Sequence, residues 1–405
     1  MISVEQAQKI ILDEIHPMPH EKILLSHALR RTLAEDIRSP LDHPPWDTSA
    51  MDGYAVRVSD TATASPKNPV LLKVIEEIPA GKLPQKTLNN GEAAKIMTGA
   101  PLPEGAEAVI KVEETASENN GVRVFAAPER GEYIRLQGEA IRAGDPVLKK
   151  GALIRPAEIA MMASIGKSVV PVFQRPRVGI LSTGDELADL DEPRGLDKIL
   201  NSNGYGLAAQ VTAAGGLPLT LGIAKDSKTD LNEKIAAGLS SDFLLISGGV
   251  SMGDYDFVLE VLETLGVTMR LWKVAMKPGK PVAFGTLQGR PVFGLPGNPV
   301  SSMVTFEEFV RPALLKALGR ASLFRPVLTA KLEETVKKRP GRRQFLRAVV
   351  SVENGEYRVR ATGHQGSAIL MSLVKANALM ILPEEGEGLH AGEKVKVQLL
   401  SDIVA

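Results

Sequence analysis

From Arg177 to Leu318 the sequence alternates between short apolar runs and segments whose apolar residues have helical spacing. The expected strands are 178–181, 218–223, 243–247, 269–274, 282–285 and 292–295, and the expected helices are 204–214, 229–237, 257–265 and 300–318. Strands that alternate with helices form a doubly wound, mainly parallel sheet, whose ligands bind at the carboxyl ends of the strands. The pattern therefore predicts an α/β domain over residues 176–322.

Three loops rich in glycine and proline follow or adjoin these strands. They are Ser247-Gly248-Gly249-Val250-Ser251-Met252-Gly253, Lys277-Pro278-Gly279-Lys280-Pro281 and Gly294-Leu295-Pro296-Gly297-Asn298-Pro299. Glycine lets the backbone approach a ligand closely, and the amides that begin a helix carry partial positive charge. We expect the three loops to form one cleft for an anionic ligand with phosphate groups.

Composition excludes several classes of function. Lysine plus arginine and aspartate plus glutamate both number 48, so no overall field attracts nucleic acid or an acidic membrane. Cysteine is absent, which excludes disulfides, thiolate metal sites and cysteine nucleophiles. No apolar run approaches the roughly 18 residues of a membrane span, and the first residues do not resemble a signal peptide. We expect a soluble, cytoplasmic protein that binds a small-molecule substrate, with no nucleic acid and no membrane partner.

The rest of the chain predicts three further parts. Residues 1–45 and 141–175 are expected to form an N-terminal helical and linker domain, with residues 1 to about 40 mostly helical after a capping box of Ser3 and Gln6. Residues 46–140 contain short β runs between turns and predict a small inserted β domain. Residues 323–405 predict a small barrel-like β domain with a hairpin turn at Asn354-Gly355. The fold class is therefore multidomain α/β plus β.

Two lysines lie on either side of the turn in the second loop. Lys277 and Lys280 flank Pro278-Gly279, so a rigid bend could direct both at one oxyanion. The alternative is an exposed turn that carries two surface lysines.

Acidic residues near the loops are candidates for chemistry with a divalent metal or phosphate. Magnesium binds few carboxylates together with phosphates and water, and Asp52 and Asp256 are predicted to serve this role. Either Asp254 or Asp256 could instead cap the helix that follows. Asp185 and Glu186 come directly after a strand, where a ligand is expected, although they could also cap a nearby helix.

Seven short motifs occur together in one order. They are Ser49-Ala50-Met51-Asp52-Gly53-Tyr54-Ala55, Met97-Thr98-Gly99-Ala100-Pro101, Ser182-Thr183-Gly184-Asp185-Glu186-Leu187, Ser247-Gly248-Gly249-Val250-Ser251, Lys277-Pro278-Gly279-Lys280-Pro281, Gly294-Leu295-Pro296-Gly297-Asn298-Pro299-Val300-Ser301 and Gly363-His364-Gln365-Gly366-Ser367. With these motifs the chain resembles the molybdopterin molybdenumtransferases, relatives of the C-terminal domain of gephyrin. The resemblance covers essentially the full length.

The resemblance implies an enzyme of molybdenum cofactor synthesis. Such an enzyme inserts molybdenum from molybdate into adenylylated molybdopterin and releases AMP, with help from Mg²⁺ or another divalent cation. It also implies a homodimer whose active cleft lies between the α/β domain of one subunit and the N-terminal β region of the other. Further partners would be the molybdopterin adenylyltransferase and proteins that mature molybdoenzymes.

The resemblance and the loops together give the candidate site residues. The catalytic candidates are Asp52, Asp256, Glu186, Lys277 and Lys280, of which Asp52 and Asp256 are also the metal candidates. The ligand-binding candidates are Thr98, Thr183, Gly184, Asp185, Ser247, Gly248, Gly249, Ser251, Pro278, Pro296, Asn298, Ser301, Arg347 and Ser367. The resemblance places Ser301, Arg347 and Ser367 near the molybdate.

One position departs from the family pattern. The family commonly has Arg-x-x-Gly-x-Asp-Ile, and residues 135–141 have Ala140 in place of the acid. A methyl group cannot bind metal or accept a proton, so Glu139 or Asp145 replaces the acid, or the acid is dispensable, or turnover is slow. Two other functions stay open. One is adenylylation of molybdopterin, because the family that performs it shares the α/β domain with its Ser-Gly-Gly loop, although it lacks the N-terminal and C-terminal β domains. The other, which Ala140 would permit, is a non-catalytic molybdopterin carrier or scaffold.

Overall fold

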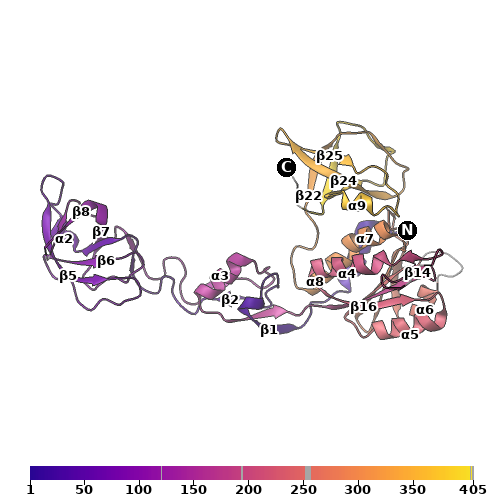
Figure 1. Ribbon diagram of the computed structural model, residues 1–405, viewed down its shortest axis with the longest axis horizontal. Coiled ribbons are helices and arrows are strands. Elements are labelled where there is room, and N and C mark those ends of the chain that lie inside the picture. The colour runs from indigo at the N-terminus through magenta and orange to yellow at the C-terminus, as the bar shows by residue number, and fades with distance from the viewer. Residues whose placement is uncertain (120, 193–194, 251–256, 402, 404–405) are drawn as a thin grey trace. The chain divides into compact units, whose positions relative to one another are not determined.

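The structure is a computed structural model that describes residues 1–119, 121–192, 195–250, 257–401 and 403 (Figure 1). The chain divides into two compact units. The larger unit comprises Met1–Ala34, Gly151–Arg155 and Val170–Ala405, and the smaller comprises Glu35–Lys150 and Pro156–Val169. Among the described residues, none of the helices combines the length and the apolar character that crossing a membrane requires.

The larger unit is built on a mixed sheet with the strand order β16-β13-β17-β21-β20-β18. Strands β16, β13, β17 and β21 run parallel, and β20 runs antiparallel to both β21 and β18. The bounds are β13 (Arg177–Thr183), β16 (Leu217–Ala224), β17 (Phe243–Ser247), β18 (Thr268–Trp272), β20 (Ala283–Leu287) and β21 (Arg290–Leu295). The predicted doubly wound, mainly parallel sheet is confirmed.

Helices cover both faces of this sheet (Figure 1). On one face, α4 (Ser202–Ala214) and a long helix that begins at Pro299 share a core with buried residues of β13, β17 and β21. On the other face, α5 (Lys228–Gly238) and α6 (Val258–Thr264) pack against Leu181, Leu244 and Ile246. Apolar side chains that alternate along each strand therefore bury against both layers of helices.

The N-terminal helix belongs to the core of the larger unit. Helix α1 (Val4–Asp13) has the predicted capping box of Ser3 and Gln6, and Val4, Ala7 and Ile11 are buried in the same core as α4. The expected continuation of helix to about residue 40 was wrong. The chain instead forms β1 (His20–Leu24), a 3-10 turn at Leu25–His27 and β2 (Ile37–Arg38), because Pro17 and Pro19 interrupt the helix.

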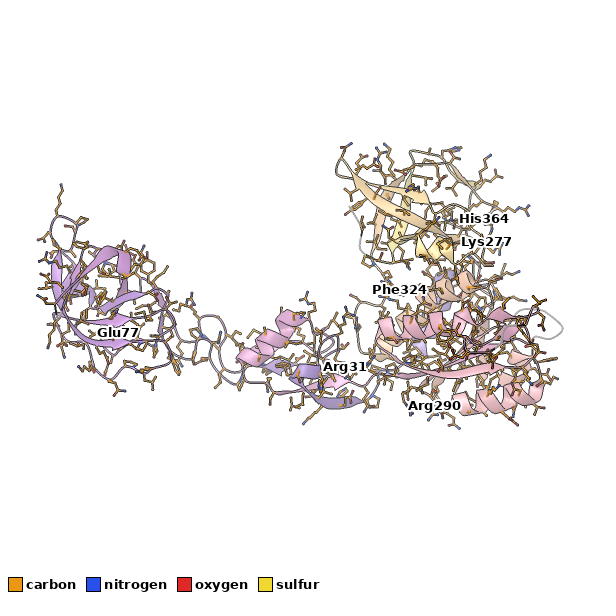
Figure 2. The ribbon with its side chains drawn as sticks, viewed as in Figure 1. Arg31, Glu77, Lys277, Arg290, Phe324 and His364 are labelled. Carbon is orange, nitrogen blue, oxygen red and sulfur yellow. The ribbon has the colours of Figure 1, made fainter. Side chains whose placement is uncertain are left out.

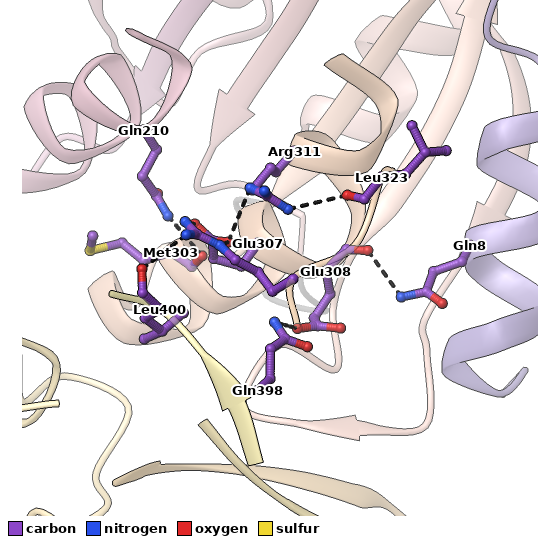
Figure 3. A network of polar contacts seen from close by, with 10 residues as sticks. Gln8, Gln210, Met303, Glu307, Glu308, Arg311, Leu323, Gln398 and Leu400 are labelled. Carbon is purple, nitrogen blue, oxygen red and sulfur yellow. Dashed lines mark hydrogen bonds and ion pairs between the residues drawn. The ribbon is translucent and has the colours of Figure 1, made fainter. Parts of the chain in front are cut away.

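The long helix contains one π-helical turn. It runs from α7 (Pro299–Thr305) through η3 (Phe306–Val310) to α8 (Arg311–Ala317). The π-helical turn carries Glu308, which accepts a hydrogen bond from Gln398 Nε2 at 2.8 Å, and its backbone carbonyl accepts one from Gln8 Nε2 at 3.2 Å (Figure 3). The helix thus joins α1 to the C-terminal strands.

The C-terminal strands close into a barrel. Its order is β24-β25-β22-β28-β26, and β26 pairs back with β24. The bounds are β22 (Val327–Leu332), β24 (Arg343–Glu353), β25 (Glu356–Ala361), β26 (Ala378–Leu382) and β28 (Lys394–Leu399), with β23 (Val336–Lys337) paired to β27 (Gly388–Leu389) and α9 (Met371–Val374) at one side. Asn354 and Gly355 have φ angles of 49° and 80°, so the predicted hairpin turn is confirmed.

The smaller unit is a small β domain. Its main sheet has the order β7-β4-β6-β5-β9-β8 around buried residues that include Tyr54, Leu72 and Ile110. The bounds are β4 (Gly53–Val56), β5 (Val70–Ile78), β6 (Glu92–Ile96), β7 (Ala108–Lys111), β8 (Thr115–Glu118) and β9 (Gly121–Val124). Short elements complete it: β3 (Thr48–Ser49), β10 (Ile134–Arg135), β11 (Pro146–Leu148), α2 (Val58–Thr61), a 3-10 turn at Val112–Glu114 and α3 (Pro156–Ser164). The predicted combination of α/β and β parts is confirmed.

Candidate active site

The carboxyl ends of β13, β17 and β21 surround a hollow of about 680 Å³, which we call the glycine-loop pocket. Its wall is formed by residues 182–184 at the end of β13, 247–250 at the end of β17 and 296–299 after β21. The start of α4 and the short strands β14 (Leu187–Ala188) and β15 (Ile199–Leu200) complete it. The hollow lies at the sheet edge where the alternating pattern predicts a ligand.

The glycines of this pocket are required by close backbone packing. Gly248 has a φ of 102°, and a Cβ there would lie 2.6 Å from the Thr183 carbonyl oxygen. A Cβ on Gly249 would lie 2.5 Å from Val258 Cγ2. The Thr183 hydroxyl oxygen is buried and has no hydrogen-bond partner among the described residues. A bare backbone beside an unsatisfied hydroxyl suits a ligand with polar oxygens.

Two asparagines that the sequence did not single out hold the pocket together. The Asn203 side-chain amide donates to Ser247 Oγ at 2.9 Å and to the Gly297 carbonyl at 2.7 Å, so it ties two of the loops to the start of α4. Asn201 caps α4 by accepting from the Gly204 amide at 3.0 Å. The spacing of an N-cap before a helix could have indicated Asn201, whereas nothing local indicates the bridge made by Asn203.

Asp185 and Glu186, the two acids that follow β13, differ in their position relative to the glycine-loop pocket. Glu186 lines the glycine-loop pocket and folds over Gly184, because a Cβ on that glycine would lie 2.4 Å from Glu186 Oε2. The Asp185 carboxylate accepts from the Asp226 amide at 3.2 Å, and the Asp226 carboxylate accepts from the Asp185 amide at the same distance. Asp226 lines the pocket, so Asp185 supports the wall through it.

A second hollow, of about 550 Å³, lies next to the first, and we call it the basic pocket. Its lining includes residues 277–281, Ser301 and residues 364–367 together with Arg342 and Arg347. Pro281 lines both pockets. The loop of the two lysines therefore reaches the glycine-loop pocket only through Pro281, while Lys277 and Lys280 line the basic pocket. Strand β19 (Met276–Lys277) pairs with β24, which draws the loop of the two lysines to the barrel.

Arg347 is the most unusual residue of the basic pocket. Its side chain is only 1% exposed, and it donates to Ser372 Oγ at 3.0 Å and to the Gly366 carbonyl at 3.1 Å. Burial lowers the pKa of Arg347 to about 10, so the guanidinium is still charged at neutral pH. No carboxylate pairs with it in the part of the chain that the structure describes. A buried cation without a counter-ion is stabilised by a bound anion.

Figure 2 marks Lys277 and His364, which both line the basic pocket. With Lys277, the lining contains the lysine and arginine side chains of Lys280, Arg342 and Arg347, and none of the lining residues is acidic. Gly279 has a φ of 102° and a Cβ there would lie 2.7 Å from Thr305 Oγ1, so the turn between the lysines requires glycine. The arrangement provides a site for a small oxyanion.

Two further candidates meet in the smaller unit. Asp52 Oδ1 accepts hydrogen bonds from the amide and the hydroxyl of Thr98, both at 2.7 Å, and these bonds lower the Asp52 pKa. Asp52 is exposed on the turn before β4. It is therefore ionised and accessible, as a ligand of a cation must be.

The structure places the remaining candidates as follows. Ser247, Pro296 and Asn298 line the glycine-loop pocket, and Pro278, Ser301 and Ser367 line the basic pocket. Ser251 and Asp256, with Asp254, lie outside the described residues. Within the described ranges, no three His, Cys, Asp or Glu side chains gather as a metal site would require.

The acids proposed to replace the family's aspartate at Ala140 are engaged in local turns. Glu139 Oε2 accepts from the Leu136 amide at 3.0 Å, and Asp145 Oδ2 accepts from the Arg142 amide at 2.9 Å. Each carboxylate thus already has a backbone partner on its own loop.

Comparisons with known proteins identify the family. Residues 2–166 match the family described as the MoeA N-terminal region (domain I and II), residues 179–316 match a probable molybdopterin binding domain, and residues 329–400 match the MoeA C-terminal region (domain IV). The chain belongs to the MoeA family. Like the curated members of that family, it is a transferase.

Individual relatives align with nearly the whole of this chain. The molybdopterin molybdenumtransferase of Nostoc sp. is 40% identical over 91% of this chain and 86% of its own length. That of Haemophilus influenzae is 36% identical over 98% of both chains. A crystal structure of the molybdopterin biosynthesis MoeA protein from Pyrococcus horikoshii superimposes with a TM-score of 0.86 at 34% identity, covering 99% of this chain and 100% of that one.

Proposed function

We propose that this chain inserts molybdenum from molybdate into adenylylated molybdopterin and releases AMP. The basic pocket would hold the molybdate, and the glycine-loop pocket would hold the nucleotide and pterin of the second substrate. The observation that carries the proposal is the contact of these two pockets at Pro281, since both reactants must lie side by side for transfer.

The chemistry of each pocket supports this assignment. Molybdate is a tetrahedral dianion, and the basic pocket offers it cationic and hydroxyl donors without a carboxylate to repel it. The second substrate carries phosphates, and the glycine-loop pocket offers it exposed backbone, the unpaired Thr183 hydroxyl and the start of α4. Lys277 and Lys280 would also stabilise negative charge that develops on oxygen during transfer.

A divalent cation, Mg²⁺ or another, would neutralise the phosphate charge as AMP leaves. Asp52 fits this role because its carboxylate is exposed and its lowered pKa keeps it ionised. We propose Asp256 as its partner in binding the metal.

We also propose that the active protein is a homodimer. Asp52 and Thr98 belong to the smaller unit, whereas both pockets belong to the larger one. We propose that Asp52 of one subunit completes the two pockets of the other subunit. A cytoplasmic location and docking of the adenylyltransferase and molybdoenzyme maturation proteins are further expectations from the resemblance.

The test measures AMP release from adenylylated molybdopterin, with molybdate and Mg²⁺, by wild type, Asp52→Asn and Lys277→Ala. Each variant alone should release little AMP. A mixed dimer, made by co-expression with two tags, should recover about half of the wild-type rate, because one of its two clefts contains neither substitution. No recovery in the mixed dimer would refute a cleft shared between subunits.

The second candidate function is a molybdopterin carrier, which is favoured by Ala140 and by the local engagement of Glu139 and Asp145. A carrier would bind adenylylated molybdopterin but would release no AMP when molybdate and Mg²⁺ are added. The wild-type assay therefore separates the two functions.

A further inference from the structure

The loop that carries His364 is held firmly against the barrel. Gln365 uses its whole side-chain amide on backbone: Oε1 accepts from the Arg347 amide at 2.9 Å, and Nε2 donates to the carbonyls of Arg347 at 3.0 Å and of Gly363 at 3.1 Å. The Ser367 carbonyl accepts from the Val300 amide at 3.0 Å, at the start of α7. The loop is thus fixed by hydrogen bonds at residues before and after His364.

A further hydrogen bond within this loop determines which nitrogen of His364 carries a proton. His364 Nδ1 accepts a hydrogen bond from the Gly366 amide at 3.1 Å. A backbone N–H can only donate, so Nδ1 must be unprotonated and the proton of the neutral ring is on Nε2. The imidazole is therefore a donor at the edge that faces away from its own loop.

The Nε2–H donor of His364 belongs to the lining of the basic pocket. His364 lines the pocket with Lys277, Lys280, Arg342 and Arg347, and no acid in the lining competes for its N–H. His364 is exposed, so burial does not explain the orientation of the ring. Its Nδ1 bond turns the remaining polar edge away from the loop backbone.

We propose that His364 is a substrate-binding residue that donates Nε2–H to an oxygen of the tetrahedral oxyanion in the basic pocket. The proposal rests on the proposed function, because the oxyanion is the molybdate of that reaction. Molybdate at neutral pH carries no proton, so all four of its oxygens can accept hydrogen bonds, from neutral donors as well as from cations. The lysines and arginines supply charge, whereas the fixed imidazole supplies one directed hydrogen bond.

Two substitutions separate the nitrogen atoms of the ring. In His364→Asn the side-chain oxygen lies near the place of Nδ1, so the bond from Gly366 is kept and the distal donor is lost. In His364→Gln the side-chain NH₂ reaches the place of Nε2, so the distal donor is kept. Molybdate binding to the full-length wild type and both variants is measured by isothermal titration calorimetry, with thermal unfolding as the check on folding.

We expect His364→Asn to weaken molybdate binding about tenfold and His364→Gln to stay within about threefold of wild type, as befits one hydrogen bond to an anion. Equal affinity in all three proteins, or weaker binding by His364→Gln than by His364→Asn, overturns the role of His364. If the wild type binds no molybdate at all, both the proposed function of the basic pocket and this proposal fail. If Lys277→Ala loses binding while both His364 variants keep it, only the proposal on His364 fails.

Discussion

The buried carboxyl of Glu308 should make the stability of the larger unit depend on pH. Glu308 lies in the π-helical turn, is 4% exposed, and has Gln398 Nε2 as a hydrogen-bond donor (Figure 3). Burial, helped by the nearby charge of Glu307, raises the pKa of Glu308 to about 7 against the opposing effects of the bond from Gln398 and the charges of Arg343 and Arg311. The folded protein therefore holds this proton more tightly than the unfolded chain does.

The sign and size of the effect follow from this difference. Well below pH 4.5 the carboxyl is protonated in both the folded and the unfolded state, so Glu308 then adds no pH dependence to the free energy of unfolding. Between pH 4.5 and about 7 only the unfolded chain loses the proton, so the free energy of unfolding falls by about 1.4 kcal/mol per pH unit. The full loss is about 3 kcal/mol, and it is complete above the folded pKa.

Urea unfolding at pH 5, 6, 7 and 8 tests this expectation in a Trp46→Phe background. The chain has 2 tryptophans, so the fluorescence then reports on Trp272, which lies in the larger unit with Glu308. Glu308→Gln keeps an acceptor for Gln398 and removes the titration. Its stability relative to the parent should rise by up to about 3 kcal/mol from pH 5 to pH 8.

Glu356→Gln, on the exposed hairpin turn of the barrel, is the matched control and should leave the pH dependence of unfolding unchanged. Parallel pH dependence in the parent and in Glu308→Gln would refute the reasoning, because it would show that Glu308 has the same proton affinity in both states.

Two further predictions concern the glycine-loop pocket. Gly248→Ala should lower the free energy of unfolding by about 1–3 kcal/mol and raise KM for adenylylated molybdopterin, because its Cβ would lie 2.6 Å from the Thr183 carbonyl at a φ of 102°. Gly297→Ala, whose Cβ would meet nothing nearer than 3.7 Å, is its control in urea unfolding and kinetics, and equal effects of both would contradict the steric argument. Trp272→Phe should raise the same KM about fivefold with little change in kcat, because the indole N–H donates to the Val250 carbonyl at 3.3 Å and holds that loop. An unchanged KM in Trp272→Phe would show that the loop keeps its shape without this bond.

Local pattern was sufficient for most of the secondary structure. Strand β17 was predicted to the residue, and the other strands of the α/β sheet agree within a few residues, because buried parallel strands are continuous apolar runs between turns. The capping box of α1 and the Asn354-Gly355 turn were also predictable, since each depends on neighbours along the chain. The prediction of helix up to about residue 40 was wrong, because Pro17 and Pro19 interrupt a helix whatever the helix preference of the residues around them.

The π-helical turn at Phe306–Val310 had no signal in the sequence. Residues 300–318 have ordinary helical spacing, and the turn is supported by partners far along the chain. Gln8 and Gln398 contact Glu308 from 300 and 90 residues away. Such a feature depends on packing that local preference does not contain.

By itself the sequence determined which residue types the site has. Glycine loops, lysines beside a turn and acids after strands indicate an anionic ligand with phosphates, because these properties belong to single residues and their neighbours. Only the tertiary structure decided how they are grouped. Pairing of β19 with β24 takes Lys277 and Lys280 to the barrel, where they line the basic pocket with buried Arg347 and with His364, while the other two loops line the adjoining glycine-loop pocket. That grouping depends on strand pairing between residues far apart in the chain, which no local pattern encodes.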